Sequence, residues 1–196
     1  MTDLIETPVP APPLRLAIIV GSNREGRFGH VVANWFVTQV EPRADMVIDL
    51  IDLADIDLPI AYPSRRSAAV DEYIDRIDIA DAYVVVTPEY NHGYPAGLKQ
   101  AIDLPQKEWR AKPVAFVSYG GKAGGLRAVE QLRQVFAELH AMTVRDSVSF
   151  HMAHGLFDEF GEPLESEGCT TTAKTMLDQL SWWAEALRTA RTVRPY

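Results

Sequence analysis

The sequence predicts an α/β protein with one sheet of five parallel strands and helices on both faces, a three-layer sandwich. Three observations predict it. Stretches with the composition of buried strands alternate with amphipathic helices five times along the chain. Loops rich in glycine or in aromatic residues follow the first, third and fourth of these strands. The length of 196 residues suits one sizeable core, so we expect residues 14–196 to form a single domain.

Five stretches have the composition of strands. Residues 83–86 read Tyr-Val-Val-Val without polar alternation, so we expect a strand that is buried on both faces. Thr87 and Pro88 end this strand, because proline cannot donate a hydrogen bond to a central ladder. In the second strand we expect the aspartates, Asp49 and Asp52, to be the exposed alternates. The other four strands are predicted over residues 14–20, 46–53, 113–119 and 142–150.

A helix is predicted after each strand, because apolar residues recur there with helical spacing. Pro42 ends the first helix, and the third opens at Pro95, where proline is tolerated. In the last helix we expect Trp183 and Leu187 to lie on the packed face. Residues 151–168 are predicted to form an irregular loop. The helices are predicted over residues 31–41, 68–80, 95–103, 126–139 and 170 to about 191.

Composition and charge restrict the classes of partner. The formal net charge of −8 argues against a nucleic-acid partner, because phosphate contacts need a basic face. The single cysteine, Cys169, permits no internal disulfide and no multi-cysteine metal cage, and we expect no metal site. The chain shows neither an apolar run of membrane-spanning length nor a signal peptide, so we expect a cytoplasmic protein without a membrane partner. Residues 1–13 carry four prolines and are predicted to form a flexible tail.

Topology brings three loops to one edge of the predicted sheet. Five strands suit the order 2-1-3-4-5 of the flavodoxin-like fold, joined by right-handed crossovers. In such sheets a ligand binds outside the carboxyl ends of the strands, where the strand order reverses. The loops at this point are residues 21–29, 87–94 and 118–125. We therefore expect them to form one ligand site.

The first loop has the features of an anion site. It runs from a strand into a helix N-terminus, where backbone amides and the helix dipole attract negative charge. Ser22, Arg24 and Arg27 add donors that suit a phosphate monoester. The loop lacks the lysine and hydroxyl of a Walker A motif, which argues against nucleoside triphosphate hydrolysis. It also lacks the G-x-G-x-x-G dinucleotide pattern. The alternative is a surface turn that needs glycine only for its backbone geometry.

The second and third loops suit a flat heterocycle. Backbone amides and Asn91 could hydrogen-bond its polar edge, with tyrosines nearby for stacking. Tyr94 could instead fill a subunit interface. Gly120 and Gly121 let the backbone approach a planar ring closely, because glycine has no side chain to clash. Three further residues could contact a second ligand or be solvated surface, namely His92, Lys122 and Arg127.

Two motifs resemble those of the NADPH-dependent FMN reductase family. Gly-Ser-x-Arg followed by Gly-x-Phe spans residues 21–28, and Thr-Pro-Glu-Tyr-Asn-x-Gly-x-Pro-x-x-Leu-Lys-x-Ala-Ile-Asp spans residues 87–103. The resemblance covers about residues 16–150 and implies a flavodoxin-like fold with FMN and NADPH as cofactors. It implies that the FMN phosphate is held by Ser22, Arg24, Arg27, Phe28 and Gly29. It implies that the isoalloxazine ring is lined by Pro88, Glu89, Tyr90 and Asn91, and by a second loop of Ser118, Tyr119, Gly120 and Gly121. Family members often carry serine or threonine in place of Arg27, and asparagine in place of Gly29.

The resemblance implies an enzyme in which FMN accepts hydride at N5 from NADPH and reduces a free flavin, quinone, azo compound or metal oxyanion. We expect no side chain to act as acid or base, because the flavin carries the chemistry. One alternative is a flavodoxin-type FMN electron carrier without nicotinamide turnover. The arginines of the first loop and the Pro-Glu-Tyr-Asn block favour the reductase. Another alternative is a non-enzymatic nucleotide-binding regulator.

Aromatic residues beside the predicted site suggest a contact between subunits. We expect Tyr90, Tyr94, Pro95 and Trp109 to form an exposed cluster around the second loop and the helix after it. Members of the family are commonly dimers or tetramers. We therefore predict a homodimer or a homotetramer built as a dimer of dimers.

Overall fold

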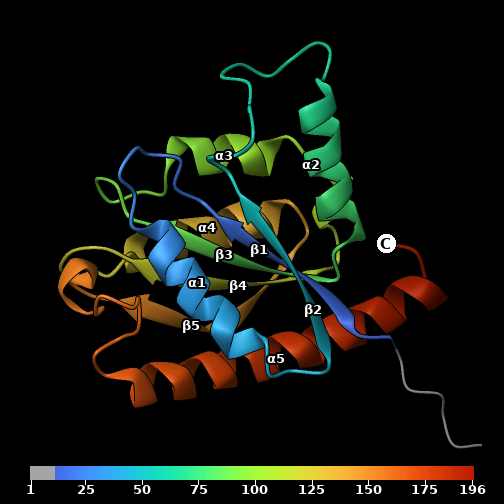
Figure 1. The fold of residues 1–196 in the computed structure, drawn as a ribbon. Coiled ribbons are helices and arrows are strands. Elements are labelled where there is room, and N and C mark those ends of the chain that lie inside the picture. The colour runs from blue at the N-terminus through green and yellow to red at the C-terminus, as the bar shows by residue number, and fades with distance from the viewer. Residues whose placement is uncertain (1–11) are drawn as a thin grey trace, which may run out of the picture.

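The computed structural model describes residues 12–196 and has at its centre a parallel sheet in the order β2-β1-β3-β4-β5 (Figure 1). The predicted fold class and strand order are confirmed. Most of the predicted tail falls on residues 1–11, which lie outside the described residues. The strands are β1 (Leu14–Val20), β2 (Met46–Asp52), β3 (Ala82–Pro88), β4 (Pro113–Tyr119) and β5 (Met142–Phe150).

The strands differ in burial according to their place in the sheet. All residues of the central strands β3 and β4 are buried, because helices cover both faces and leave no solvated side. On the edge strand β2, Val47 and Leu50 are exposed, whereas Asp49 and Asp52 form ion pairs with arginines. The prediction that the aspartates are the exposed alternates is therefore wrong. Arginine partners let these carboxylates lie against the protein at low cost.

Helices form a layer on each face of the sheet (Figure 1). One apolar core lies under α1 and α5, and a second lies under α2, α3 and α4. No helix within residues 12–196 is long and apolar enough to cross a membrane. The helices are α1 (Gly29–Val40), α2 (Ala68–Ile79), α3 (Ala96–Asp103), α4 (Leu126–Glu138) and α5 (Ser166–Val193), with short 3-10 turns η1 (Lys107–Trp109) and η2 (Ala153–Gly155).

Helix α5 is longer than predicted and takes in the end of the segment that was expected to be an irregular loop. Leu180 and Ala184 are buried in the core on the α1 side of the sheet. Trp183 is 37% exposed, so the prediction that it packs inward is wrong. Successive helical residues are rotated by about 100°, which carries Trp183 off the face defined by Ala184. Leu187 is half-buried, at the margin of that face.

Candidate functional site

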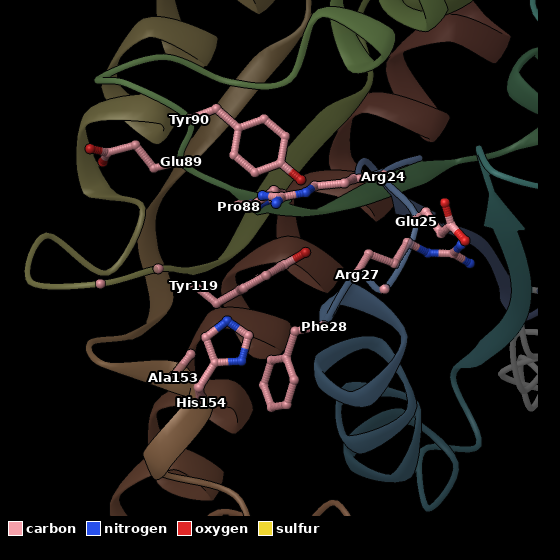
Figure 2. Close-up of a pocket in the computed structure, with 13 residues that line it drawn as sticks. Arg24, Glu25, Arg27, Phe28, Pro88, Glu89, Tyr90, Tyr119, Ala153 and His154 are labelled. Atoms are coloured by element: carbon pink, nitrogen blue, oxygen red, sulfur yellow. The ribbon is translucent and has the colours of Figure 1, made fainter.

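A cavity of about 410 Å³ lies at the carboxyl edge of the sheet, between the loops that follow β1, β3 and β4 (Figure 2). The three loops meet where the strand order predicts, because parallel strands all end at the same edge. The predicted site residues that line the cavity are Arg24, Arg27, Phe28, Pro88, Glu89, Tyr90, Tyr119, Gly120 and Gly121.

Two predicted site residues, Ser22 and Ser118, are fully buried and do not line the cavity. The Ser22 hydroxyl lies 2.7 Å from the hydroxyl of Tyr90 and links the first loop to the second. The Ser118 hydroxyl donates to the carbonyl oxygen of Gly124 at 2.8 Å and holds the third loop in place. Both serines therefore act on the shape of the cavity through its loops.

The start of α1 forms one end of the cavity. Within the described part of the chain, no side chain caps the N-terminus of α1, and its first turn carries no acidic residue. Gly29, the first helical residue, is buried beneath Tyr119. Arg27 pairs with Asp52 at the end of β2, and its buried Nε has no partner among residues 12–196. Arg24 extends beneath the ring of Tyr90 in Figure 2. The helix N-terminus and the unpartnered Arg27 Nε make this end favourable for an anion.

The second loop is held by hydrogen bonds and by a contact with α4. The Tyr90 N–H donates to the Gly93 carbonyl at 2.8 Å, and the Gly93 N–H donates back at 3.1 Å. Between these two residues, Asn91 and His92 have φ values of 51° and 71°, in the left-handed region. Asn91 is exposed and lines a separate cavity of about 280 Å³ with Lys122. The structure therefore places Asn91 beside the main cavity and not in it.

Glu89 is attached to the start of α4. Its side chain is 6% exposed and forms an ion pair with Arg127, whose backbone N–H also donates to Glu89 at 3.2 Å. Figure 2 shows the Glu89 carboxylate pointing away from Tyr90 and Tyr119. The Arg127 guanidinium also lies 2.6 Å from His92 Nε2. Glu89 therefore fixes the position of the second loop against α4.

The third loop turns sharply over the end of β4. Gly125 has a φ of 85°, and a Cβ there would lie 2.7 Å from the Ser118 Cβ, so only glycine fits. The Gly120 N–H donates to the Phe150 carbonyl at 3.1 Å, which ties the loop to β5. Gly121 is exposed and would admit a larger side chain. The loop thus presents backbone to the cavity.

Sequence reasoning missed the wall that follows β5. Ala153 and His154, in η2, line the cavity, and the His154 ring lies 4.9 Å from the Phe28 ring between centroids. The segment carries no regular pattern, so the sequence suggested only a loop. Strand order could have indicated this wall, because β5 is parallel to β4 and ends at the same edge of the sheet, so the segment after it lies near the cavity. Glu25 and Gly26 of the first loop also line the cavity without having been predicted.

The expected exposed aromatic cluster is not present as predicted. Trp109 is fully buried, and its Nε1–H donates to the Ile102 carbonyl at 3.0 Å. Pro95 is also buried, and Tyr94 packs against the core between α3 and α4. The exposure that suggested a subunit contact is thus absent for Trp109 and Pro95. The oligomeric state stays a prediction.

Comparison with known proteins identifies the family. The family model for NADPH-dependent FMN reductases matches residues 14–155. The NAD(P)H-dependent FMN reductase LOT6 of Saccharomyces cerevisiae is 35% identical over 140 residues, which cover 62% of this chain and 73% of the yeast protein. A quinone reductase of Escherichia coli is 36% identical over 139 residues, covering 67% and 73%. An NAD(P)H-dependent FMN reductase of Pseudomonas aeruginosa is 31% identical over 179 residues, covering 87% and 95%.

Solved structures support the fold. A flavoenzyme NAD(P)H:acceptor oxidoreductase from Paracoccus denitrificans superimposes with a TM-score of 0.72 at 23% identity, over 88% of this chain and 98% of that one. A flavodoxin from Pseudomonas aeruginosa gives a TM-score of 0.56 at 18% identity, over 88% and 99%. The match of the family model over residues 14–155 goes further than fold, and the chain belongs to the NADPH-dependent FMN reductase family of oxidoreductases.

Proposed function

We propose that the protein uses FMN to pass hydride from NADPH to a small oxidised acceptor, such as a free flavin, a quinone, an azo compound or a metal oxyanion. The observation that carries the proposal is the cavity itself, in which an uncapped helix start with arginines and a backbone-lined aromatic platform share one sheet edge. Relatives named FMN reductase and quinone reductase support the same class of reaction.

The end of the cavity at the start of α1 fits a phosphate. The free amides at the start of α1 favour an anion, and Arg27 Nε is a buried donor without a partner among the described residues. Arg24 also lines the cavity and is exposed; its guanidinium lies beneath the Tyr90 ring in Figure 2, and rotation of its long side chain toward α1 would let it pair with a second phosphate oxygen. Glu25 also lines the cavity but is exposed to solvent, which weakens its repulsion of an anion.

The opposite end fits a flat ring. Pro88 is buried at the end of β3, and the half-buried Tyr90 stands beside it. Gly120 and Gly121 offer backbone on the facing side, where a ring can approach closely. A volume of about 410 Å³ lies within the range of roughly 300–1,000 Å³ that is typical of cofactor pockets. The residues present therefore fit FMN, with its phosphate at α1 and its ring between the second and third loops.

When bound, FMN would accept a hydride at N5 and supply the redox chemistry, so the chain's own residues bind and orient. The ion pair with Arg127 keeps Glu89 and the second loop in one position against α4. The bond between Ser22 and Tyr90 fixes the distance between the first and second loops. No side chain is required as acid or base in this scheme, and the predicted roles of the lining residues are positional.

The experiment that tests the proposal mixes purified protein with FMN and NADPH under anaerobic conditions. We expect bleaching of the visible flavin absorbance, and recovery of colour when a quinone is added. Tight FMN binding without bleaching would support the flavodoxin-type carrier instead. Absence of flavin binding would favour the nucleotide-binding regulator and refute the proposal.

A pair of arginine variants tests whether Arg24 contacts the phosphate of FMN. Arg24→Ala removes a donor to the proposed phosphate, so the dissociation constant for FMN should rise by about tenfold or more. Arg145→Ala, whose side chain is 91% exposed on β5, removes the same charge elsewhere and should change FMN affinity less than twofold. Equal effects of the two substitutions would show that Arg24 contributes only net charge.

A further inference from the structure

The hydroxyl of Tyr119 is the starting observation. Tyr119 is the last residue of β4 and is 5% exposed. Its hydroxyl oxygen is buried and lies near the Ser22 hydroxyl, which is paired with Tyr90; among residues 12–196 it forms no hydrogen bond of normal geometry. Buried polar groups are nearly always paired in folded proteins, because an unpaired one loses its hydration without compensation. Figure 2 shows the side chain reaching across the cavity with its hydroxyl toward the first loop.

Gly29 shows where this hydroxyl lies. A Cβ built on Gly29 would stand 2.6 Å from the Tyr119 hydroxyl and 3.5 Å from the ring carbon that carries it. The hydroxyl thus occupies the place of a side chain on the first residue of α1. That place adjoins the free amides of the helix N-terminus, which attract an acceptor of negative charge.

Arg27 supplies an independent observation in the same turn. Its guanidinium pairs with Asp52, yet its Nε is buried without a partner in the described part of the chain. A guanidinium only donates hydrogen bonds. Burial raises the pKa of Tyr119 above its usual value, so its hydroxyl also keeps its proton at neutral pH. Two buried donors that have no acceptor within residues 12–196 therefore lie beside the start of one helix, and an anionic acceptor would satisfy both.

We propose that the Tyr119 hydroxyl donates a hydrogen bond to the phosphate of bound FMN beside Arg27 Nε, and that Gly29 is required because any side chain there would displace this hydroxyl. This inference rests on the proposed function. It makes Tyr119 a residue that selects flavin mononucleotide over riboflavin. It also assigns Tyr119 to the phosphate end of the cavity, whereas the sequence placed it at the ring side.

Tyr119→Phe tests the proposal, because it removes the hydroxyl and keeps the ring. Binding is measured by quenching of flavin fluorescence, with FMN and riboflavin titrated separately. We expect the dissociation constant for FMN to rise by about tenfold or more, and that for riboflavin to change less than twofold. Equal weakening of FMN and riboflavin binding would place the hydroxyl against the ribityl chain or the ring. Unchanged binding of both flavins would show that the hydroxyl contacts only water. Either result would overturn the proposal.

A double-mutant cycle tests the role of Gly29. Gly29→Ala in the wild-type chain should weaken FMN binding by pushing the hydroxyl aside. In the Tyr119→Phe background the same substitution should have a much smaller effect, because the contact at 2.6 Å is gone and only a tight contact with Val20 Cγ1 at 3.3 Å and one with the ring at 3.5 Å remain. Additive effects in the cycle would refute the coupling. Wild-type protein that binds neither flavin would instead refute the proposed function, so the two failures are distinguishable.

Discussion

Lys112 is a buried cation on the side of the molecule away from the cavity. Its residue is 6% exposed, and its Nζ donates to the carbonyl oxygens of Ile77 at 3.2 Å and Asp78 at 2.6 Å. These carbonyls belong to the last turn of α2, where a cation opposes the partial negative charge of the helix end. Burial lowers the pKa of Lys112 from 10.5 to about 8, because desolvation outweighs these favourable contacts.

The lowered pKa makes stability depend on pH. Below about pH 8 the lysine is charged in both states, and the full cost of burying its charge, about 3 kcal/mol, is present. Between about pH 8 and 10.5 the unfolded chain binds more protons than the folded chain, so the free energy of unfolding rises with pH. The linkage relation gives a gain of about 2 kcal/mol from Lys112 between about pH 7.5 and 9.5.

Urea unfolding followed by tryptophan fluorescence measures this gain. We compare wild type with Lys112→Met and with Lys107→Met, which replaces an exposed lysine nearby. Wild type and Lys107→Met should gain about 2 kcal/mol more than Lys112→Met over this interval. Burial also raises the pKa values of Tyr73, Tyr83 and Cys169, which lowers stability at high pH in all three proteins and cancels in the comparison. The same pH dependence in Lys112→Met as in wild type would refute the reasoning.

Two further predictions concern the loops of the cavity. Arg127→Ala removes the ion pair and leaves the Glu89 carboxylate, which is 6% exposed, with one backbone donor. We expect a loss of about 1–2 kcal/mol in the free energy of unfolding, a moderate value because the Arg127 side chain is 46% exposed to solvent. The double variant with Glu89→Gln should recover part of this loss, and wild-type stability of Arg127→Ala would contradict the ion pair. Gly125→Ala should cost more than about 2 kcal/mol, because the residue has a positive φ and its Cβ would overlap Ser118. Gly168→Ala, in α5 with open space around it, should leave the melting temperature unchanged or raise it, and equal loss in both glycine variants would show that the turn does not need Gly125.

Much of the fold could be predicted, because burial leaves a direct mark on the sequence. The run from Tyr83 to Val86 lacks polar residues since helices cover both faces of β3. The exposure of the aspartates on β2 was harder to predict, because an aspartate on an edge strand can be either solvated or paired. Asp52 is paired with Arg27, 25 residues earlier in the chain. The burial of Trp109 depends likewise on residues distant in the chain, since its ring packs against Tyr83 and Phe136.

Some features of the candidate site could likewise be predicted from the sequence, and others could not. Loop convergence follows from strand order, which the alternation of elements predicted. The orientation of the side chains within the loops does not follow from strand order, because it depends on hydrogen bonds between one loop and another. Ser22 and Ser118 turn inward to Tyr90 and Gly124, and Asn91 faces the neighbouring cavity. The contribution of His154 could not be found from its segment, which shows no periodic pattern.

The sequence by itself determined the layers, the strand order and the edge at which a ligand would bind, because each depends on local periodicity and on general rules of chain connection. Only the tertiary structure decided which donors beside the cavity have no partner among residues 12–196. The Tyr119 hydroxyl and Arg27 Nε have no partner in the described part of the chain, because Gly29 leaves room above α1 and Asp52 engages only part of the guanidinium. Those contacts join β2, β4 and α1, and no pattern within one segment encodes them.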